Sequence, residues 1–325
     1  MPARISRLLP EQLRRLTGRL VRRRVISTTL LGGVLAVAAL VVPDSTVTPM
    51  NVALVKLPHA AAADLGGLTS KKGVIWILAV GSDARPGENM LHTRGDALQL
   101  IGINTKTGAA SSIGVPRDSW VDIPGHGYNK INAALYYGGP QGLGNAVGNL
   151  VGIHPSYVFV TRFPYLINMV NAIGGITVDN PVAFSDSALK PKGFKKGRIH
   201  LDGYDAMAFS RIRHALIRGD FDRSANQQRV LRGIQQKIRQ HQDDVGFLAN
   251  GVASVMKNLH TNMSPTELYR LAEAVAHVNP RRITTCVVQG GIGDINGASV
   301  VLPDVSGARA MGDEARNDAT IEHCR

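Results

Sequence analysis

The stretch Val74-Ile75-Trp76-Ile77-Leu78-Ala79-Val80-Gly81-Ser82-Asp83 decides the fold of this 325-residue chain. Its first seven residues are apolar and are followed by a glycine, a pattern typical of a short buried strand. A second apolar run, residues 98–103, ends at Asn104 and predicts a neighbouring strand. Because Asp83 follows the first strand and Asp96 precedes the second, a simple sheet places both carboxylates at one edge.

Strands and helices alternate along the rest of the chain. Short apolar runs predict further strands at residues 112–115, 157–161 and 283–288. Ser264-Pro265-Thr266-Glu267 is a capping box with proline at the first helical position, and it predicts a helix to about His277. Residues 225–240 predict a surface helix with one packed face, and residues 165–173 predict a helix that ends at Gly174-Gly175. This alternation favours a layered α/β sandwich.

The N-terminal region predicts a membrane anchor. Eight arginines and a single acid, Glu11, precede residues 25–42, which carry no charge. A helix of that length, at about 1.5 Å per residue, can just cross roughly 30 Å of hydrocarbon. The arginine excess predicts that residues 1–24 form a cytoplasmic tail and that the chain after the span is exported. The alternative is a cleaved signal peptide with Ala60-Ala61-Ala62-Ala63 as its cleavage site, although these alanines lie far beyond the apolar run.

The remaining sequence predicts a tether followed by one exported domain. Residues 43–70 are rich in alanine and glycine and predict a linker, so residues 71–325 are expected to form an extracytoplasmic domain. The tail supplies a net seven of the thirteen formal positive charges, which leaves the exported part only moderately basic. With 5% aromatic residues the chain also lacks an evident stacking platform, and we expect no nucleic-acid partner.

Two cysteines fit an oxidising compartment. Cys286 lies in a predicted strand and Cys324 is the penultimate residue, so a disulfide between them would hold the C-terminal tail. Disulfides persist outside the cytosol, which agrees with export. Two unpaired buried thiols are the alternative.

Five arginines beside carboxylates or other arginines predict an anion site. They are Arg94, Arg117, Arg211, Arg213 and Arg223. Each stands near the end of an apolar run, where a strand or helix can deliver it to one cleft. Guanidinium groups bind phosphate oxygens bidentately, so several at one place indicate a ligand with more than one phosphate charge, such as a diphosphate.

The acids beside these arginines predict a magnesium site. Mg²⁺ usually takes one or two carboxylates together with substrate phosphates and water. Asp83 and Asp96, flanked by Arg85 and Arg94, offer such a pair, although either acid alone is more often a turn or cap residue.

Taken in order, the motifs resemble the LytR-CpsA-Psr family. Seven of them fall between residue 74 and about residue 240: Gly-Ser-Asp, Arg-x-Asp, Pro-Arg-Asp, Lys-Ile-Asn-x-Ala-x-x-Tyr-Gly-Gly, Arg-x-Arg, Asp-Phe-x-Arg and Gln-Gln. The fourth is Lys130-Ile131-Asn132-Ala133-Ala134-Leu135-Tyr136-Tyr137-Gly138-Gly139 in this chain. The resemblance implies a three-layer α-β-α sandwich with a mixed central sheet, whose core forms an apolar pocket for a prenyl chain.

The resemblance also implies an activity. Members of the family are membrane-anchored enzymes that move a glycopolymer from a polyprenyl-diphosphate carrier to a peptidoglycan sugar hydroxyl and release polyprenyl phosphate. By motif, Asp83 and Asp96 would hold Mg²⁺, and the diphosphate would bind Arg94, Arg117, Arg211, Arg213, Arg223 and Gln227. Either Asp96 or Asp118 would take the hydroxyl proton. We favour Asp118, because a metal-bound Asp96 is a poor base.

The chain departs from the family pattern at a few positions. Gly95 and Ala97 stand where a serine or threonine usually flanks the acid, and Asp222 stands where the family has glycine. Asn226 replaces the arginine that often precedes the glutamine pair, which predicts one basic group fewer at the rim of the site.

Three questions stay open at the level of the sequence. A carrier-binding protein, a diphosphate hydrolase without ligase activity and a membrane-tethered regulator are the alternatives to a transferase. The glycopolymer is unspecified, but a bias towards alanine, arginine, glycine and valine resembles a GC-rich actinobacterial gene and favours arabinogalactan. Finally, one group of apolar residues would either line a prenyl channel or fill a core: Val158, Val160, Leu166, Ile167, Val170 and Ile173.

Overall fold

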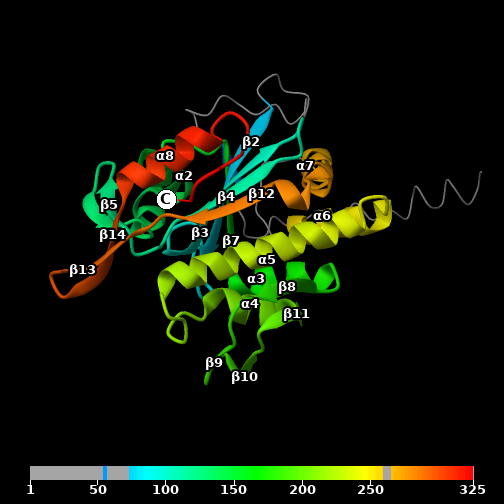
Figure 1. The fold of residues 1–325 in the computed structure, drawn as a ribbon, viewed down its shortest axis with the longest axis horizontal. Helices are drawn as coiled ribbons and strands as arrows, with labels where there is room; N and C mark the ends of the chain where they lie inside the picture. The colour runs from blue at the N-terminus through cyan, green and yellow to red at the C-terminus, as the bar shows by residue number, and fades with distance from the viewer. Residues whose placement is uncertain (1–53, 57–72, 259–264, 325) are drawn as a thin grey trace, which may run out of the picture. The chain divides into compact units, whose positions relative to one another are not determined.

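A mixed six-stranded sheet forms the centre of the protein (Figure 1). The computed structural model describes residues 54–56, 73–258 and 265–324. In spatial order the strands are β1 (Leu54–Lys56), β7 (Tyr157–Arg162), β2 (Val74–Ser82), β3 (Gly95–Asn104), β4 (Ala110–Gly114) and β12 (Ile283–Val287). Strand β2 runs parallel to β7 and antiparallel to β3, and β12 runs parallel to β4.

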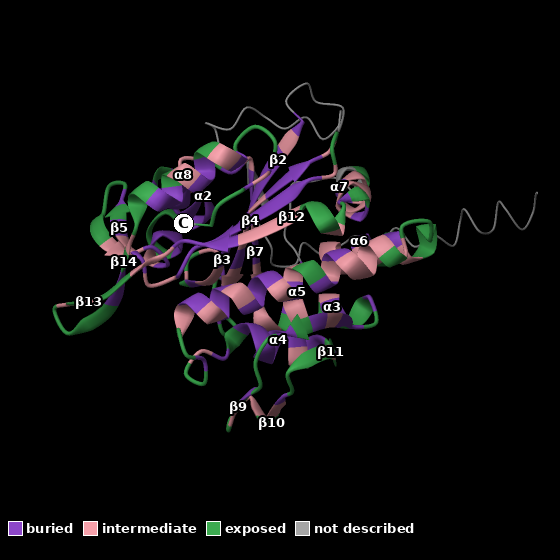
Figure 2. Cartoon of the chain, in the orientation of Figure 1, coloured by how far each residue is buried: buried purple, intermediate pink, exposed green. Residues whose placement is uncertain are grey.

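The side chains of β2 alternate between two apolar layers, as the two-residue period of a strand requires. Trp76, Leu78 and Val80 pack against α2 (Ala133–Val151) and α8 (Val305–Ala315). Ile75 and Ile77 face the opposite way, towards α6 (Val245–Asn258) and α7 (Pro265–His277). On that second side also lie α3 (Phe163–Ala172), α4 (Gly203–Arg211) and α5 (Asp220–Gln240). Figure 2 shows the strands buried between these helical layers.

Four two-stranded ladders and one short helix surround this core. The ladders are β5 (Trp120–Ile123) with β6 (Gly127–Lys130), β8 (Ile176–Asn180) with β11 (Gly197–Leu201), β9 (Phe184–Asp186) with β10 (Lys190–Phe194), and β13 (Gly290–Ile295) with β14 (Ala298–Pro303). A 3₁₀ helix, η2 (Pro280–Arg282), precedes β12. Phe184, Phe194 and Phe209 join the β9–β10 ladder to α4, since their ring centroids lie 5.1–5.3 Å apart.

The strands and helices predicted from the sequence are present, and α5 differs most from its prediction. It begins at Asp220 rather than near residue 225. Asp220 and Asp222 lie in its first turn, where negative side chains interact favourably with the helix dipole. It is also more deeply buried than a surface helix with one packed face. Arg223, Gln227 and Gln228 are all less than 9% exposed, so polar residues that suggested a solvated face lie inside the protein.

Several predicted features lie outside the described residues: the tail (1–24), the membrane span (25–42), most of the linker (43–70) and the capping residue Ser264. The described part of the predicted linker, residues 54–56, forms β1 and pairs with β7 in the central sheet, so these three residues belong to the fold and are not a tether. Over residues 54–56, 73–258 and 265–324, no helix combines the length and the apolarity that a membrane crossing requires. The C-terminal tail, in contrast, is described as far as Cys324. This residue forms a disulfide with Cys286 of β12, with a Cα–Cα distance of 5.3 Å.

Candidate active site

A β-bulge turns Asp96 out of the regular ladder. Gly81 pairs with Ala97 and Ser82 pairs with Gly95, so Asp96 is the extra residue on β3. Bulges of this kind redirect a side chain at the end of a strand. Asp83 lies at the same end of the sheet, where its backbone N–H donates to the carbonyl of Arg94 at 3.0 Å. The pairing of β2 with β3 therefore brings the two acidic segments together.

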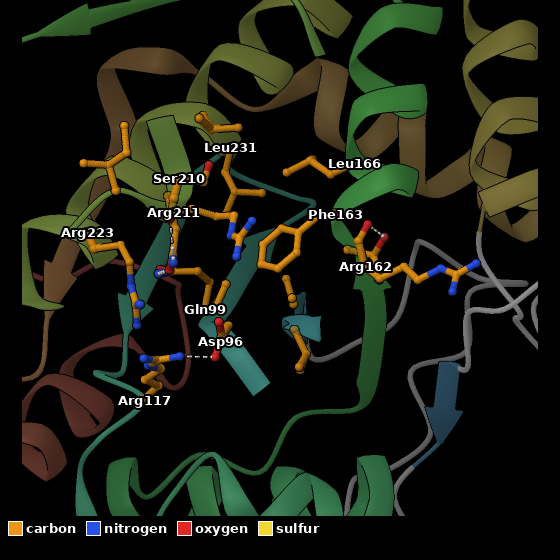
Figure 3. A pocket seen from close by; sticks show the side chains of 18 of the residues that line it. Asp96, Gln99, Arg117, Arg162, Phe163, Leu166, Ser210, Arg211, Arg223 and Leu231 are labelled. Atoms are coloured by element: carbon orange, nitrogen blue, oxygen red, sulfur yellow. Dashed lines mark hydrogen bonds and ion pairs between the residues drawn. The ribbon is translucent and has the colours of Figure 1, made fainter. Parts of the chain in front are cut away.

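Beside Asp96 a cavity of about 450 Å³ opens between the sheet and the helices α3 and α5. On the sheet side it is lined by small residues, Ala79, Gly81 and Ala97, which leave space above the strands. On the helix side its walls are apolar and include Leu166, Met169, Val230, Leu231 and Ile234. Figure 3 shows Leu166 and Leu231 on one side of this cavity and the Asp96–Arg117 pair on the opposite side.

A second, almost wholly apolar cavity of about 230 Å³ adjoins the first. The two share Phe159, Leu166, Met169 and Ile234 in their linings. We call the two cavities together the lipid cavity, because most of the residues that line them are apolar. Among the apolar residues with two possible roles, Leu166 lines both parts and Ile173 lines the second, whereas Val158, Val160 and Val170 are fully buried in the core.

Four of the predicted arginines meet at the mouth of the cavity. Its lining includes Asp96, Arg117, Arg211, Arg213, Arg223 and Gln227. Arg117 forms an ion pair with Asp96, drawn as a dashed line in Figure 3. Arg211 and Arg213 both reach the mouth because Ile212 between them is extended and buried. Arg211 stacks on Phe163, with its guanidinium carbon 4.1 Å from the ring centroid.

Asp220 connects two of these arginines. One carboxylate oxygen accepts a hydrogen bond from the backbone N–H of Arg117 at 3.0 Å, and the other forms an ion pair with Arg223. Burial raises the pKa of Asp220, an effect that the charge of Arg223 opposes. Burial likewise lowers the pKa of Arg223 in spite of its pairing with Asp220. The pair is therefore held by the fold at a cost in desolvation.

Arg117 is the best-compensated cation of the group. Burial alone lowers its pKa, but attraction to Asp96, with smaller contributions from Asp118 and Asp220, raises the pKa above its ordinary value. The Nε–H groups of Arg117 and Arg223 are buried and have no hydrogen-bond partner among the described residues. Buried donors normally find a partner, so these two are suited to an anionic ligand.

Asp118 contributes to the mouth indirectly. It does not line the cavity, but its oxygens lie 3.1 Å from Nζ of Lys130 and 3.4 Å from Nη1 of Arg213. It thereby links Arg213 to Lys130, which is the last residue of β6 and the first residue of the Lys-Ile-Asn motif.

A buried amide network positions Gln227. Its side-chain oxygen accepts from Nε2 of Gln99 at 3.1 Å, and its own Nε2 donates to the carbonyl of Ser210 at 3.3 Å. Gln99 also donates to Oγ of Ser224 at 3.0 Å. The only sequence signal for this network is Gln99 itself, a polar residue within the apolar run of β3.

Two predicted site residues lie elsewhere. Arg94 is exposed and does not line the cavity, and its backbone N–H donates to Oδ1 of Asp83 at 3.0 Å. Asp83 is likewise absent from the cavity lining. Instead, Arg162 and Phe163 at the end of β7 line the mouth. Because β7 is parallel to β2, its carboxyl end reaches the same edge of the sheet, and a parallel pairing would have predicted this.

Of the departures from the family pattern, Ala97 lines the sheet side of the cavity, whereas the other three lie outside its lining. Asn226 is only 3% exposed and accepts from Nη1 of Arg229 at 2.8 Å, so it does not lie at the rim as the sequence suggested. Asp222 pairs with Arg218 away from the cavity lining. Gly95 is closely packed, since an added Cβ would lie 3.0 Å from Leu98.

No cluster of three or more histidine, cysteine or acidic side chains suitable for a metal occurs within the described parts of the chain. Of the two acids predicted to hold a metal, Asp96 lines the cavity and Asp83 does not, so a metal ion at the mouth would also have to rely on its ligand's own oxygens.

The comparisons with known proteins agree with this geometry. The model of the LytR_cpsA_psr family matches residues 46–317, and the chain belongs to this family. It is 31% identical over 208 residues to the polyisoprenyl-teichoic acid–peptidoglycan teichoic acid transferase TagU of Bacillus cereus, a match that covers 64% of this chain and 66% of that relative.

Solved structures resemble the fold closely. The crystal structure of B. subtilis TagV superposes with a TM-score of 0.64 at 25% identity, covering 74% of this chain and 95% of that one. A structure of TagT bound to LI-WTA superposes with a TM-score of 0.65 at 25% identity, covering 82% of this chain and 99% of that one.

We predict that Asp220→Ala destabilises the protein by about 3–5 kcal/mol, because it leaves the buried guanidinium of Arg223 without its partner. Removing both charges in Asp220→Ala/Arg223→Leu should recover part of this loss. Urea unfolding of the full chain in a mild detergent measures both. Asp313→Ala is the matched control, since its i,i+3 pair with Arg316 is exposed and should contribute little. A double variant no more stable than Asp220→Ala would contradict the pairing argument.

Proposed function

We propose that the protein is a phosphotransferase that moves a glycopolymer from a polyprenyl-diphosphate carrier to a peptidoglycan sugar hydroxyl and releases polyprenyl phosphate. One observation carries the proposal: an apolar cavity between sheet and helices ends at a cluster of five arginines, the four predicted ones and Arg162. A lipid diphosphate is apolar along one end and doubly charged at the other, which matches this division. The name of the TagU relative supports a transfer from a polyisoprenyl carrier to peptidoglycan.

The diphosphate would bind at the mouth through Arg117, Arg211, Arg213 and Arg223. Guanidinium groups suit this role because their N–H groups match the spacing of phosphate oxygens. The Nε–H groups of Arg117 and Arg223, which have no hydrogen-bond partner among the described residues, would gain hydrogen bonds to the ligand. Arg94 would not bind the diphosphate, because it is exposed and lies outside the cavity lining.

The reaction follows from this placement of charge. The acceptor hydroxyl oxygen attacks the phosphorus that carries the glycopolymer, and the bond from that phosphorus to the bridging oxygen breaks. Polyprenyl phosphate leaves, and the polymer is joined to the acceptor through a phosphodiester. Negative charge on the transferring oxygens is stabilised by the arginines, the usual source of catalysis in phosphoryl transfer.

We propose that Asp118 accepts the hydroxyl proton. Asp96 already forms an ion pair with Arg117 inside the mouth, whereas Asp118 lies behind Arg213 and Lys130 outside the cavity lining. An acceptor that arrives while a lipid fills the cavity approaches from that outer side. A carboxylate between cations is a weak base, but a loose transition state demands little from the base.

We propose Mg²⁺ as the cofactor, held by Asp96 and Asp83. Oδ1 of Asp83 accepts from Arg94 and Oδ1 of Asp96 pairs with Arg117, while no hydrogen bond or ion pair among described residues engages the second oxygen of either. Two carboxylates suffice when substrate phosphates and water complete the shell. When bound, the ion would neutralise charge on the transferring phosphate.

We further propose that the chain is anchored by residues 25–42, with its N terminus in the cytoplasm and its catalytic domain outside. The arginine-rich tail and the uncharged span support this orientation. The disulfide between Cys286 and Cys324 suits an oxidising compartment. For the glycopolymer we propose arabinogalactan on compositional grounds, and teichoic acid, which the TagU relative's name contains, is the competing substrate to test.

Topology is tested with reporter fusions. A reporter enzyme that is active only outside the cytoplasm should be active when it is fused to the C terminus of the protein. The same reporter should be inactive when it is fused at residue 20. A silent C-terminal fusion together with an active fusion at residue 20 would overturn the proposed orientation and the activity with it.

We predict that Arg117→Gln lowers the rate of polyprenyl phosphate release about 10²–10³-fold, as expected when one donor to the transition-state charge is removed. Arg94→Gln is the control, because it also removes a guanidinium near Asp96 but outside the cavity, and its rate should stay within a factor of two or so of wild type by the same reasoning. Equal losses in the two variants would show that the cavity mouth is not the diphosphate site.

We predict that Ala79→Leu weakens the binding of long-chain polyprenyl diphosphate, because the larger side chain fills part of the cavity floor. Binding of a short-chain analogue should change little. Ala253→Leu, on an exposed position of α6, adds the same volume outside the cavity and should affect neither. Isothermal titration with the two chain lengths measures the difference, and unchanged long-chain affinity in Ala79→Leu would place the lipid elsewhere.

A further inference from the structure

The two sides of α5 carry different cavities. Its residues on the lipid cavity are Arg223, Gln227, Val230, Leu231, Ile234 and Ile238. A separate cavity of about 560 Å³ is lined from the same helix by Phe221, Ala225, Gln228, Arg229, Arg232, Gly233 and Gln236. Successive helical residues are rotated by about 100°, so the stripe Ala225, Arg229, Arg232 and Gln236 lies opposite Gln227 and Val230. This second cavity also touches β8 and β12, which flank α5 in Figure 1.

A third cavity extends the second along the helix. It has a volume of about 410 Å³ and shares Thr177, Asp179 and Gln236 with it. We call the two together the outer groove. It follows α5 from Arg218, just before the helix, to Gln240 at its end, about 30 Å at 1.5 Å per residue. A groove of that length suits a chain rather than a small molecule.

The outer groove is strongly basic. Its lining contains five arginines, Arg198, Arg218, Arg229, Arg232 and Arg239, against a single acid, Asp179. Asp222, which is not in the lining, pairs with Arg218 at 3.7 Å. No other ion pair among the described residues involves these arginines, so most of the positive charge in the groove is uncompensated.

Neutral oxygens hold three of the arginines in place. Arg229 donates to the side chain of Asn226 at 2.8 Å, and Arg232 donates to the carbonyl of Pro280 at 3.0 Å. Arg239 donates to the carbonyls of Ala276 and Val278 at 3.2 and 3.0 Å. These contacts fix the guanidinium groups without neutralising them. Burial lowers the pKa of Arg229, an effect that the charge of Asp222 opposes only in part.

The neutral polar side chains of the lining are suited to hydroxyl groups. Gln236, Gln240, Gln242 and Gln289 supply amide groups, and Thr177 and Thr285 supply hydroxyls. Together with fixed guanidinium groups, these are the partners for a polymer that carries both carboxylates and sugar hydroxyls.

The groove reaches the active site at one end. Arg218 and Phe221 line the groove, and Asp220 between them holds Arg117 and Arg223 at the mouth of the lipid cavity. A chain in the groove therefore presents one end near the arginines. Because α5 separates the groove from the lipid cavity, a carrier lipid and a second substrate can be bound at the same time.

We propose that the outer groove binds the peptidoglycan acceptor strand through the carboxylates of its stem peptides. The inference rests on the proposed function, which requires a donor and an acceptor to meet at the mouth. The arginines of the mouth would bind the phosphates of the donor. The second row of arginines, on the opposite face of α5, is therefore available to bind the acceptor.

The test measures the binding of fluorescently labelled, soluble peptidoglycan strands to the full-length protein in detergent micelles. Two forms are compared: strands with their stem peptides and strands from which an amidase has removed them. The variant is Arg229→Gln/Arg232→Gln, with Arg281→Gln as the control, an exposed arginine of η2 outside the groove. Gln236→Trp narrows the groove without changing its charge.

Intact strands should bind at least about tenfold more weakly to the double variant, as expected for two lost charge-assisted contacts. Gln236→Trp should also weaken binding, and Arg281→Gln should not. Wild type should prefer intact strands to stripped ones. Unchanged affinity in both groove variants, or an equal loss in Arg281→Gln, would overturn the site. A preference of wild type for stripped strands would overturn the role of the carboxylates.

The outcome is separable from that of the proposed function. If wild type releases polyprenyl phosphate in response to peptidoglycan but the groove variants bind strands normally, only the groove assignment fails. If wild type neither binds polyprenyl diphosphate nor transfers, the proposed function itself fails, whatever the strand affinities are.

Discussion

The ion pair between Asp220 and Arg223 is the contact on which the arrangement of the site depends. Both side chains are at most 10% exposed, so neither charge can be left alone without a large penalty. Asp220 also accepts the backbone N–H of Arg117, which follows β4. The N terminus of α5 is therefore fixed to the edge of the sheet, and the position of α5 in turn decides where the lipid cavity and the outer groove lie.

The cavity needs a second condition, which is a shortage of side-chain volume. Ala79, Gly81 and Ala97 occupy neighbouring ladder positions on the sheet surface that faces α5, where larger residues would fill the space. Protein interiors are normally packed without such voids, and an unfilled apolar cavity lowers stability. A fold that keeps this volume open at the mouth of an arginine cluster is better explained by a ligand than by stability.

The sequence allowed the strands, the arginine cluster and the family to be predicted, because each is encoded within a short segment. Arg211 and Arg213 reach the mouth together since the residue between them is buried, which local alternation could indicate. Other features depend on tertiary pairing. The bulge at Asp96 follows from the register of β2 with β3. The exposed position of Arg94, which directly precedes β3, depends on the same pairing. Asp220 belongs to a predicted motif, but its two contacts could not be predicted. Arg117 is distant in sequence, and the pairing with Arg223 matters because both side chains are buried. The row of arginines on α5 was hidden because a basic helix face usually means only a solvated surface.

The most direct measurement is the release of polyprenyl phosphate from a polyprenyl-diphosphate-linked oligosaccharide by the wild-type full chain, with and without peptidoglycan and Mg²⁺. The account predicts release that requires both, with the sugar recovered on the acceptor through a phosphodiester. Release without an acceptor would indicate a diphosphate hydrolase. Tight binding without any release would indicate a carrier-binding protein, and either result would contradict a transferase.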